Sequence, residues 1–208
     1  MKKIVGILAN TLGFDSDNPF DDKNFVQNQY INAIKENGGI PIIIPAVNLK
    51  INRDALDICD AFLITGGKKY HEYHFEVIDY ALKNNKKLLG ICMGMQLIGM
   101  YFNRDYNEKT LKCILNHYYD NITHKNKELL IHDVFIDDNS LAYKIFGKKI
   151  KVNSIHKQAL TDVTLPLKIV GISLDNTIEI VEYDNIIGVQ FHPELMKNTD
   201  SLFKWLTG

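Results

Sequence analysis

A single cysteine stands between glycines at the end of an apolar run. In the segment GICMGMQ, Cys92 follows the apolar residues 88–91 and is flanked by Gly90 and Gly94. A strand that turns sharply into a helix needs small residues around the turn, and such an elbow presents its central side chain alone above the sheet. The amino end of a helix also favours a thiolate over a thiol. Cys92 is therefore a candidate nucleophile, although a buried structural cysteine would be compatible with the same local pattern.

The C-terminal third supplies the base that such a nucleophile needs. In GVQFHPE, an apolar strand ends at His192, Pro193 and Glu194. Pro193 restricts the backbone, so the imidazole and the carboxylate leave the strand end in a set relation, and the carboxylate can hold one imidazole tautomer. We predict that Cys92, His192 and Glu194 act as nucleophile, base and orienting group.

The composition excludes several classes of partner. The 208 residues are 46% hydrophobic and carry 24 basic and 25 acidic side chains, for a net charge of -1. No positive excess exists to bind nucleic acid or an anionic membrane, and no run approaches the roughly 18 apolar residues of a membrane span. We expect one soluble, cytoplasmic domain covering residues 1–208.

The sequence predicts neither a metal nor a cofactor. The chain has three cysteines, without Cys-x-x-Cys spacing: Cys59, Cys92 and Cys113. This count argues against a disulfide framework and a structural zinc site. His71 and His74 are spaced as two ligands on one helix face, but no third ligand at suitable spacing is evident. Three more histidines are interpreted as surface or satisfied core residues: His117, His124 and His132.

The order of elements predicts an α/β fold. Buried strands are expected at 3–9, 40–45, 61–65 and 87–92, and helices within 24–39, near 52–58, at 71–84 and from about residue 93. Residues 10–23 read as a polar loop. Strand-like segments follow with few helices between them, at 129–136, 149–153, 167–174, 177–183 and 186–191, before a last helix near 199–206. This order favours a doubly wound, mainly parallel central sheet with helices on both faces and antiparallel additions, whose ligand binds at the carboxyl ends of the strands.

Two motifs together carry a family resemblance. GICMGMQ followed about a hundred residues later by GVQFHPE resembles the class I glutamine amidotransferase superfamily, whose Cys-His-Glu triads use these motifs in this order. The segments YINAIKENGGIPIIIP (30–45) and VNSIHKQAL (152–160) are similar to stand-alone γ-glutamyl hydrolases of the γ-glutamyl-γ-aminobutyrate hydrolase type.

The resemblance implies a role for each matched position. It makes Cys92 the nucleophile, His192 the general base and then acid, and Glu194 the orienting residue. The backbone amides of Gly67 and Met93 would stabilise the oxyanion. Five further residues are expected to bind the substrate: Gln96, Ser154, His156, Lys68 and Lys69. Gln96 would bind the α-amino or α-carboxylate group of the γ-glutamyl moiety.

The activity implied is hydrolysis of a γ-glutamyl amide through a thioester, with release of glutamate and an amine. The alternative is a glutaminase subunit that delivers ammonia to a separate synthetase, a partner that the hydrolase-like segments do not favour. The relatives have a long loop after Gly67, whereas this chain has only KKYHEYH (68–74) before Phe75. A short loop with Lys68 and Lys69 would suit an anionic leaving group, although two solvated lysines would look the same. The specific hypothesis is that the substrate is γ-glutamyl-CDP-amidate, which would release cytidine diphosphoramidate for capsule modification. The alternative substrate is a small γ-glutamyl amine such as γ-glutamyl-γ-aminobutyrate.

Overall fold

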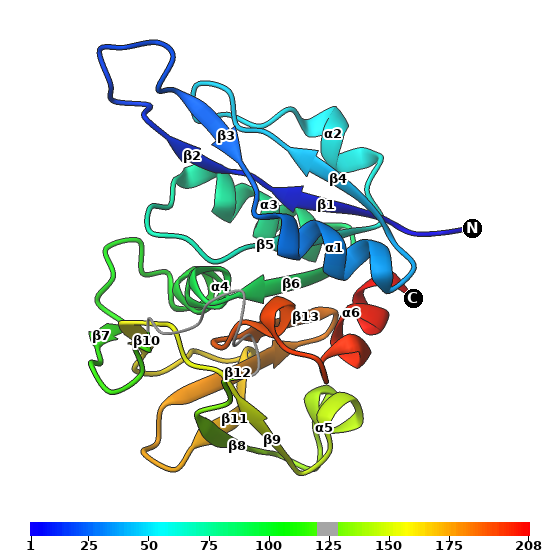
Figure 1. The fold of residues 1–208 in the computed structure, drawn as a ribbon, viewed down its shortest axis with the longest axis vertical. Coiled ribbons are helices and arrows are strands. Elements are labelled where there is room, and N and C mark those ends of the chain that lie inside the picture. Colours follow the sequence, from blue (N-terminus) through cyan, green and yellow to red (C-terminus); the bar gives the residue numbers. More distant parts are fainter. Residues whose placement is uncertain (120–128) are drawn as a thin grey trace.

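A nine-stranded sheet runs through the protein (Figure 1). The computed structural model describes residues 1–119 and 129–208. In spatial order the strands are β4 (Ile40–Ile44), β1 (Ile4–Leu8), β5 (Ala61–Ile64), β6 (Lys87–Ile91), β13 (Ile186–Val189), β12 (Ile178–Tyr183), β11 (Lys168–Ser173), β8 (His132–Ile136) and β9 (Lys149–Val152). The helices are α1 (Asn28–Glu36), α2 (Arg53–Asp57), α3 (Glu72–Lys83), α4 (Met93–Asn103), α5 (Leu141–Phe146) and α6 (Asp200–Thr207).

The sheet changes from parallel to antiparallel at β13. Strands β4, β1, β5, β6 and β13 pair in parallel, and β12, β11, β8 and β9 add to them in antiparallel fashion. The predicted fold class is therefore confirmed. The sequence groups the segment 186–191 with the antiparallel additions, but β13 pairs in parallel with β6 as well as forming a hairpin with β12. Because β13 and β6 are parallel, the carboxyl ends of both strands meet at the same edge of the sheet.

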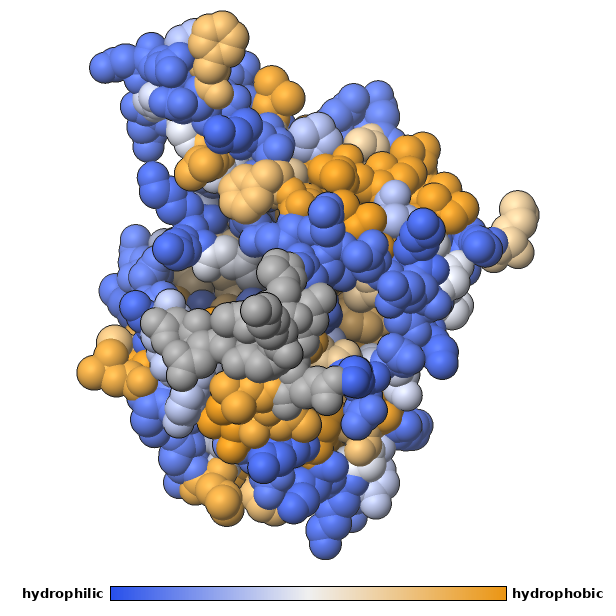
Figure 2. Space-filling view, in the orientation of Figure 1, coloured by the Kyte–Doolittle hydropathy of each residue, from blue (hydrophilic) through white to orange (hydrophobic). Residues whose placement is uncertain are grey.

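Helices cover both faces of the sheet. Because successive strand residues point to opposite sides, Phe62 and Ile64 of β5 pack with residues of α2, α3 and α4, while Ala61 and Leu63 pack with α1, α5 and α6. Figure 1 shows α1, α5 and α6 in front of the sheet. At one edge β4 is less covered, and Figure 2 shows apolar surface in this region, where Ile40 and Ile43 are exposed. No helix in residues 1–119 and 129–208 is long and apolar enough to cross a membrane.

Several local expectations differ from the structure. The polar segment 10–23 begins and ends in a small hairpin, formed by β2 (Asn10–Leu12) and β3 (Lys23–Phe25). Pairing with β2 holds Phe25 outside the first helix, which begins at Asn28. The helix is followed by Gly38, whose φ of 89° is a conformation that glycine adopts readily. Helix α5 was not predicted, and β7 (Leu111–Cys113) forms a separate two-stranded antiparallel sheet with β10 (Gln158–Leu160).

Candidate active site

Cys92 occupies a sharp turn between β6 and α4. Its backbone has φ 53° and ψ -105°, a conformation that is costly for a residue with a side chain. A methyl group on Gly90 would lie 2.6 Å from the carbonyl of Gly94, and one on Gly94 would collide with the carbonyl oxygen of Ile64. The predicted need for small residues around the turn is confirmed. The turn places the Cys92 side chain at the carboxyl edge of the sheet, at the start of a helix.

His192 and Glu194 lie at the end of the neighbouring strand β13. The Nδ1 atom of His192 is 2.7 Å from Oε1 of Glu194, whose side chain is only 3% exposed. A short 3-10 helix, Pro193–Leu195, carries the carboxylate back towards the ring. Because Nδ1 is held by the carboxylate, Nε2 is the ring nitrogen that can exchange a proton with a nucleophile.

The charged groups around His192 favour its protonated form. Burial alone would lower the pKa of His192, but the Glu194 carboxylate and the Cys92 thiolate beside it outweigh burial and hold this pKa well above its usual range. A raised imidazole pKa favours the imidazolium, which can give a proton to a departing group.

Gly66 lies between the cysteine and the histidine. A methyl group at this position would be 2.8 Å from Cε1 of His192 and 3.5 Å from Cβ of Cys92. The Gly66 amide donates a hydrogen bond to the Tyr30 hydroxyl at 3.0 Å. Burial, with the Glu194 charge adding to it, raises the pKa of Tyr30 well above its usual range, so this hydroxyl stays protonated. Since the Gly66 amide is engaged, the amides of Gly67 and Met93 are the candidates for an oxyanion site.

Asn153 holds the backbone of His192 at both polar atoms. Its Nδ2 donates to the His192 carbonyl oxygen and its Oδ1 accepts from the His192 amide, each at 2.8 Å. Sequence reasoning missed Asn153 and Tyr30. Asn153 lies in the segment 152–160 that carried the family resemblance, whereas Tyr30 looked like any apolar residue of an amphipathic helix.

A cavity of about 690 Å³ opens over Cys92 and His192. Of the expected substrate-binding residues, three line it: Gln96, His156 and Lys68. Lys69 and Ser154 are not among the described residues that line it. The Lys69 ammonium lies 3.9 Å from an Asp15 carboxylate oxygen in solvent, and Ser154 is fully buried with its hydroxyl directed at His117.

The side chain of Gln96 has a defined orientation. Its Nε2 donates to the Gln158 carbonyl oxygen at 2.9 Å and to Oε1 of Gln190 at 3.2 Å. Only an amide nitrogen can donate to these two oxygens, so Oε1 of Gln96 is the atom left for a substrate. An acceptor oxygen suits an α-ammonium group better than an α-carboxylate.

The remaining histidines differ from expectation in one case. His74 is buried and its Nδ1 accepts from the His71 amide at 3.1 Å, so the pair caps α3. His117 is a buried, hydrogen-bonded histidine, as expected. The interpretation is wrong for His132, because its Nε2 is buried and has no hydrogen-bond partner among the described residues. His124 lies outside the described residues.

Comparison with known proteins places this architecture in a family. The chain is 27% identical over 229 residues to protein NtpR of Enterococcus hirae, covering 97% of this chain and 95% of the relative. It is 29% identical over 188 residues to a putative glutamine amidotransferase of Schizosaccharomyces pombe, covering 79% and 73%.

Solved structures share the fold at lower identity. A putative GMP synthase protein from Thermoplasma acidophilum has a TM-score of 0.70 at 17% identity, over 99% of this chain and 93% of that one. The glutaminase domain of Trypanosoma brucei CTPS, solved with bound acivicin, has a TM-score of 0.70 at 17% identity, over 98% and 91%. The sequence profile of peptidase C26 matches residues 3–73 and 68–194, and this chain therefore belongs to the peptidase C26 family.

Proposed function

We propose that this protein is a cysteine-dependent amidase that hydrolyses γ-glutamyl amides through a thioester. One observation carries the proposal: Cys92 stands at a strained elbow, next to a histidine held by a buried carboxylate, on the wall of a cavity large enough for a small molecule. Membership of the peptidase C26 family and the similarity to glutamine amidotransferase relatives support the reaction class. The three free cysteines suit a reducing, cytoplasmic location.

The proposed reaction follows from the placement of these groups. The Cys92 thiolate attacks the γ-carbonyl carbon, and the amides of Gly67 and Met93 stabilise the oxyanion. The imidazolium of His192 then gives its Nε2 proton to the departing amine as the C–N bond breaks. Water attacks the resulting thioester while His192 accepts a proton from it, and glutamate leaves as the thiolate and imidazolium are restored.

Replacement of the cysteine tests this mechanism. We expect Cys92→Ala to reduce glutamate release from γ-glutamyl amides by at least about 10⁴-fold, since the covalent route is lost. Mass spectrometry of the acid-quenched wild-type enzyme should show a γ-glutamyl adduct on the peptide that contains Cys92. Cys113→Ala is the matched control, because this cysteine is exposed on β7. Substantial turnover by Cys92→Ala would rule out the mechanism.

The side of the cavity near Lys68 favours an anionic leaving group. Lys157 also lines the cavity, with its ammonium 4.2 Å from the centre of the Tyr118 ring. Two ammonium groups could bind the phosphates of a phosphate-linked amine, and an aromatic ring could stack on a nucleobase. The specific substrate that we propose is therefore γ-glutamyl-CDP-amidate, with cytidine diphosphoramidate as the released amine and capsule modification as its use. Glu108 lines the same cavity and would disfavour an anion near itself.

A pair of neighbouring lysines provides a controlled test. We expect Lys68→Ala to raise KM for a nucleotide-linked γ-glutamyl amide by about 10-fold or more and to leave KM for γ-glutamyl-γ-aminobutyrate nearly unchanged. Lys69→Ala removes the same charge one residue further along, outside the lining of the cavity, and should change neither value. Equal effects of both variants on both substrates would contradict an anionic subsite at Lys68.

A glutaminase subunit remains the second candidate. Glutaminase regions occur in CTP synthase and GMP synthase relatives, and the structural neighbours include a CTPS glutaminase domain. A subunit of this kind needs a synthetase to complete its reaction. Glutamine hydrolysis that rises strongly only when a synthetase co-purifies would support it, whereas hydrolysis of γ-glutamyl amides by the isolated chain supports the stand-alone hydrolase.

A further inference from the structure

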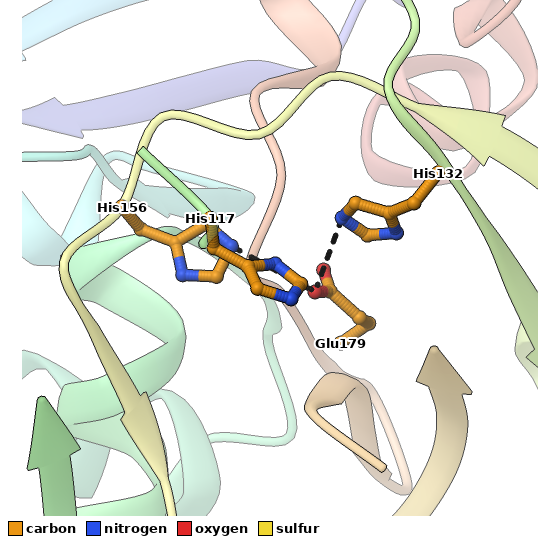
Figure 3. Close-up of side chains that lie close together, drawn as sticks. All are labelled: His117, His132, His156 and Glu179. Atoms are coloured by element: carbon orange, nitrogen blue, oxygen red, sulfur yellow. Dashed lines mark ion pairs between the residues drawn. The ribbon is translucent and has the colours of Figure 1, made fainter. Parts of the chain in front are cut away.

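Three histidines surround a buried glutamate beside the active-site cavity. His132 belongs to β8, Glu179 to β12, His117 to the segment after β7, and His156 to the loop before β10. Figure 3 shows the rings gathered around the carboxylate. The Oε1 atom of Glu179 is 3.5 Å from Nδ1 of His117, 3.6 Å from Nε2 of His132 and 3.7 Å from Nε2 of His156. The potential ligand atoms all lie within 4.8 Å of one another.

The separations from Oε1 of Glu179 are close to those of a tetrahedral metal site, although the ligand atoms as a set lie up to 4.8 Å apart. Zinc binds imidazole nitrogen and carboxylate oxygen at about 2.0 to 2.2 Å, so two ligand atoms on a tetrahedron are roughly 3.3 to 3.6 Å apart. Each distance from Oε1 of Glu179 to a histidine nitrogen is therefore within a few tenths of an ångström of a tetrahedral edge. Small side-chain movements would bring the four ligands around one ion.

In each ring the inner nitrogen lies nearest Glu179, and the other, outer nitrogen faces a hydrogen-bond acceptor. Nε2 of His117 is 2.9 Å from Oδ2 of Asp175. Nδ1 of His156 is 3.1 Å from the Gln158 carbonyl oxygen, and Nδ1 of His132 is 3.5 Å from its neighbour's carbonyl oxygen. Since these oxygens only accept, the outer nitrogens of His117 and His156 carry the proton, and the inner nitrogen of each neutral ring presents a lone pair. The His132 contact is at the outer limit of a hydrogen bond. Outer partners of this kind orient the histidine ligands of metal ions in proteins.

The interior of the cluster contains acceptors without a donor. Glu179 is fully buried, and neither of its carboxylate oxygens has a hydrogen-bond partner among the described residues. The hydroxyl of Ser154 lies 3.1 Å from Nδ1 of His117 and 3.3 Å from Nε2 of His156, and its one proton is donated to the His117 carbonyl oxygen at 2.8 Å. Imidazole lone pairs and a carboxylate therefore face one another, which is unfavourable unless a cation lies between them.

Protons satisfy this arrangement only in part. One proton shared between Oε1 of Glu179 and one ring nitrogen would leave the other two inner nitrogens facing the same oxygen. A divalent ion would satisfy all four ligand atoms at once.

We propose that His117, His132, His156 and Glu179 bind one divalent transition-metal ion, with Zn²⁺ the preferred occupant. Three imidazole nitrogens and one carboxylate oxygen form a borderline ligand set of the kind that zinc accepts, and the four side chains offer four-coordinate geometry. This proposal revises the expectation that the chain has no metal site. Each outer partner is already in place, and His132 is half-buried at the edge of the cluster.

The ion would also position the catalytic histidine. His156 shares a loop with Asn153, which holds the backbone of His192. A metal ion that joins this loop to β8 and β12 would restrict the movement of Asn153. The histidine that lines the cavity would then be a metal ligand, and its contribution to substrate binding would be indirect.

Metal binding is tested without reference to amidase activity. The wild-type chain is freed of metal with a chelator, titrated with Zn²⁺, and examined for bound metal by elemental analysis. We expect one ion per chain, and a tetrahedral ligand-field spectrum without a thiolate band after Co²⁺ substitution. Glu179→Gln keeps the shape and removes the charge, and should weaken Zn²⁺ binding by at least about 100-fold. Asp175→Asn removes the carboxylate that orients His117 and should weaken it by about 10- to 100-fold.

Matched variants distinguish this site from the catalytic one. Cys92→Ala and His74→Gln should both keep one ion, since Cys92 belongs to the active-site elbow and His74 caps α3. If Glu179→Gln does not fold, His132→Gln at the edge of the cluster replaces it and should show the same loss. The proposal is overturned if the wild type binds no stoichiometric Zn²⁺, if Cys92→Ala abolishes binding, or if the folded ligand variants bind as tightly as the wild type. An infrared carbonyl band of a protonated Glu179 in the Zn²⁺-treated protein, absent from Glu179→Gln, would also overturn it.

Discussion

A single methyl group at Gly66 should separate Cys92, the proposed nucleophile, from His192. In Gly66→Ala the new carbon would lie 2.8 Å from Cε1 of His192, 3.0 Å from the Tyr30 hydroxyl oxygen and 3.5 Å from Cβ of Cys92. Ordinary van der Waals contact begins at 3.4 Å. The His192 ring must therefore move by roughly half an ångström or more, and it would pull against its hydrogen bond to Glu194.

The size of the effect follows from this displacement. A misplacement of about 1 Å at a reacting group can reduce a rate by roughly 10²-fold, so we expect kcat of Gly66→Ala to fall by about 10- to 100-fold. Overpacking of a buried site lowers the free energy of unfolding by about 1 to 3 kcal/mol. Replacing glycine with alanine also restricts the unfolded chain, which raises the free energy of unfolding by about 0.4 to 1 kcal/mol. The variant should therefore fold, with a moderately lower free energy of unfolding.

Gly39→Ala is the control for this experiment. A methyl group at Gly39 meets Thr207 and Ile34 side chains at 2.7 and 2.8 Å, so the crowding is similar. This glycine precedes β4, at the amino end of the parallel strands and opposite Cys92. Urea unfolding and steady-state kinetics with a γ-glutamyl amide measure both variants. If Gly39→Ala loses as much kcat as Gly66→Ala, or if Gly66→Ala keeps wild-type kcat, the steric argument is refuted.

Two further predictions concern buried polar contacts. Asn153→Ala leaves the amide and carbonyl of His192 unpaired and should lower the free energy of unfolding by about 2 to 4 kcal/mol in urea titrations, with a larger change in kcat than in KM; full activity in a stable variant would contradict this. Burial lowers the pKa of His74 to about 4, below the 6.5 of the unfolded chain, so the unfolded state takes up its proton first as pH falls. The wild type should lose up to about 3 kcal/mol between pH 7 and 4 that His74→Gln does not lose, and parallel pH profiles of the two proteins would exclude this role.

The elbow and the base were predictable because they are local. Gly90, Cys92 and Gly94 are neighbours in the chain, and the crowding that requires glycine arises from the strand-to-helix turn and from Ile64 on the adjacent strand. His192 and Glu194 are two residues apart, so their contact needs only the short helical turn at Pro193. Alternating strands and helices likewise predicted a parallel sheet, but the parallel pairing of β13 with β6, which brings His192 to the same edge as Cys92, was seen only in the folded structure.

Side chains that come from distant segments could not be assigned from the sequence. Lys68 and Lys69 are equivalent in the chain, yet the path of the loop directs one towards the cavity and the other towards Asp15. Ser154 was expected at the substrate, but the burial of its loop turns the hydroxyl towards His117.

Spacing and periodicity along the chain predicted the class of fold and marked Cys92, His192 and Glu194 as candidates, and the family resemblance implied their roles. The folded structure was needed to show that Asn153 holds His192 and that three histidines surround Glu179. Those contacts join the segment after β7, strands β8 and β12, and the loop before β10. Their partners are set by sheet order and register, which place residues side by side regardless of their separation in sequence.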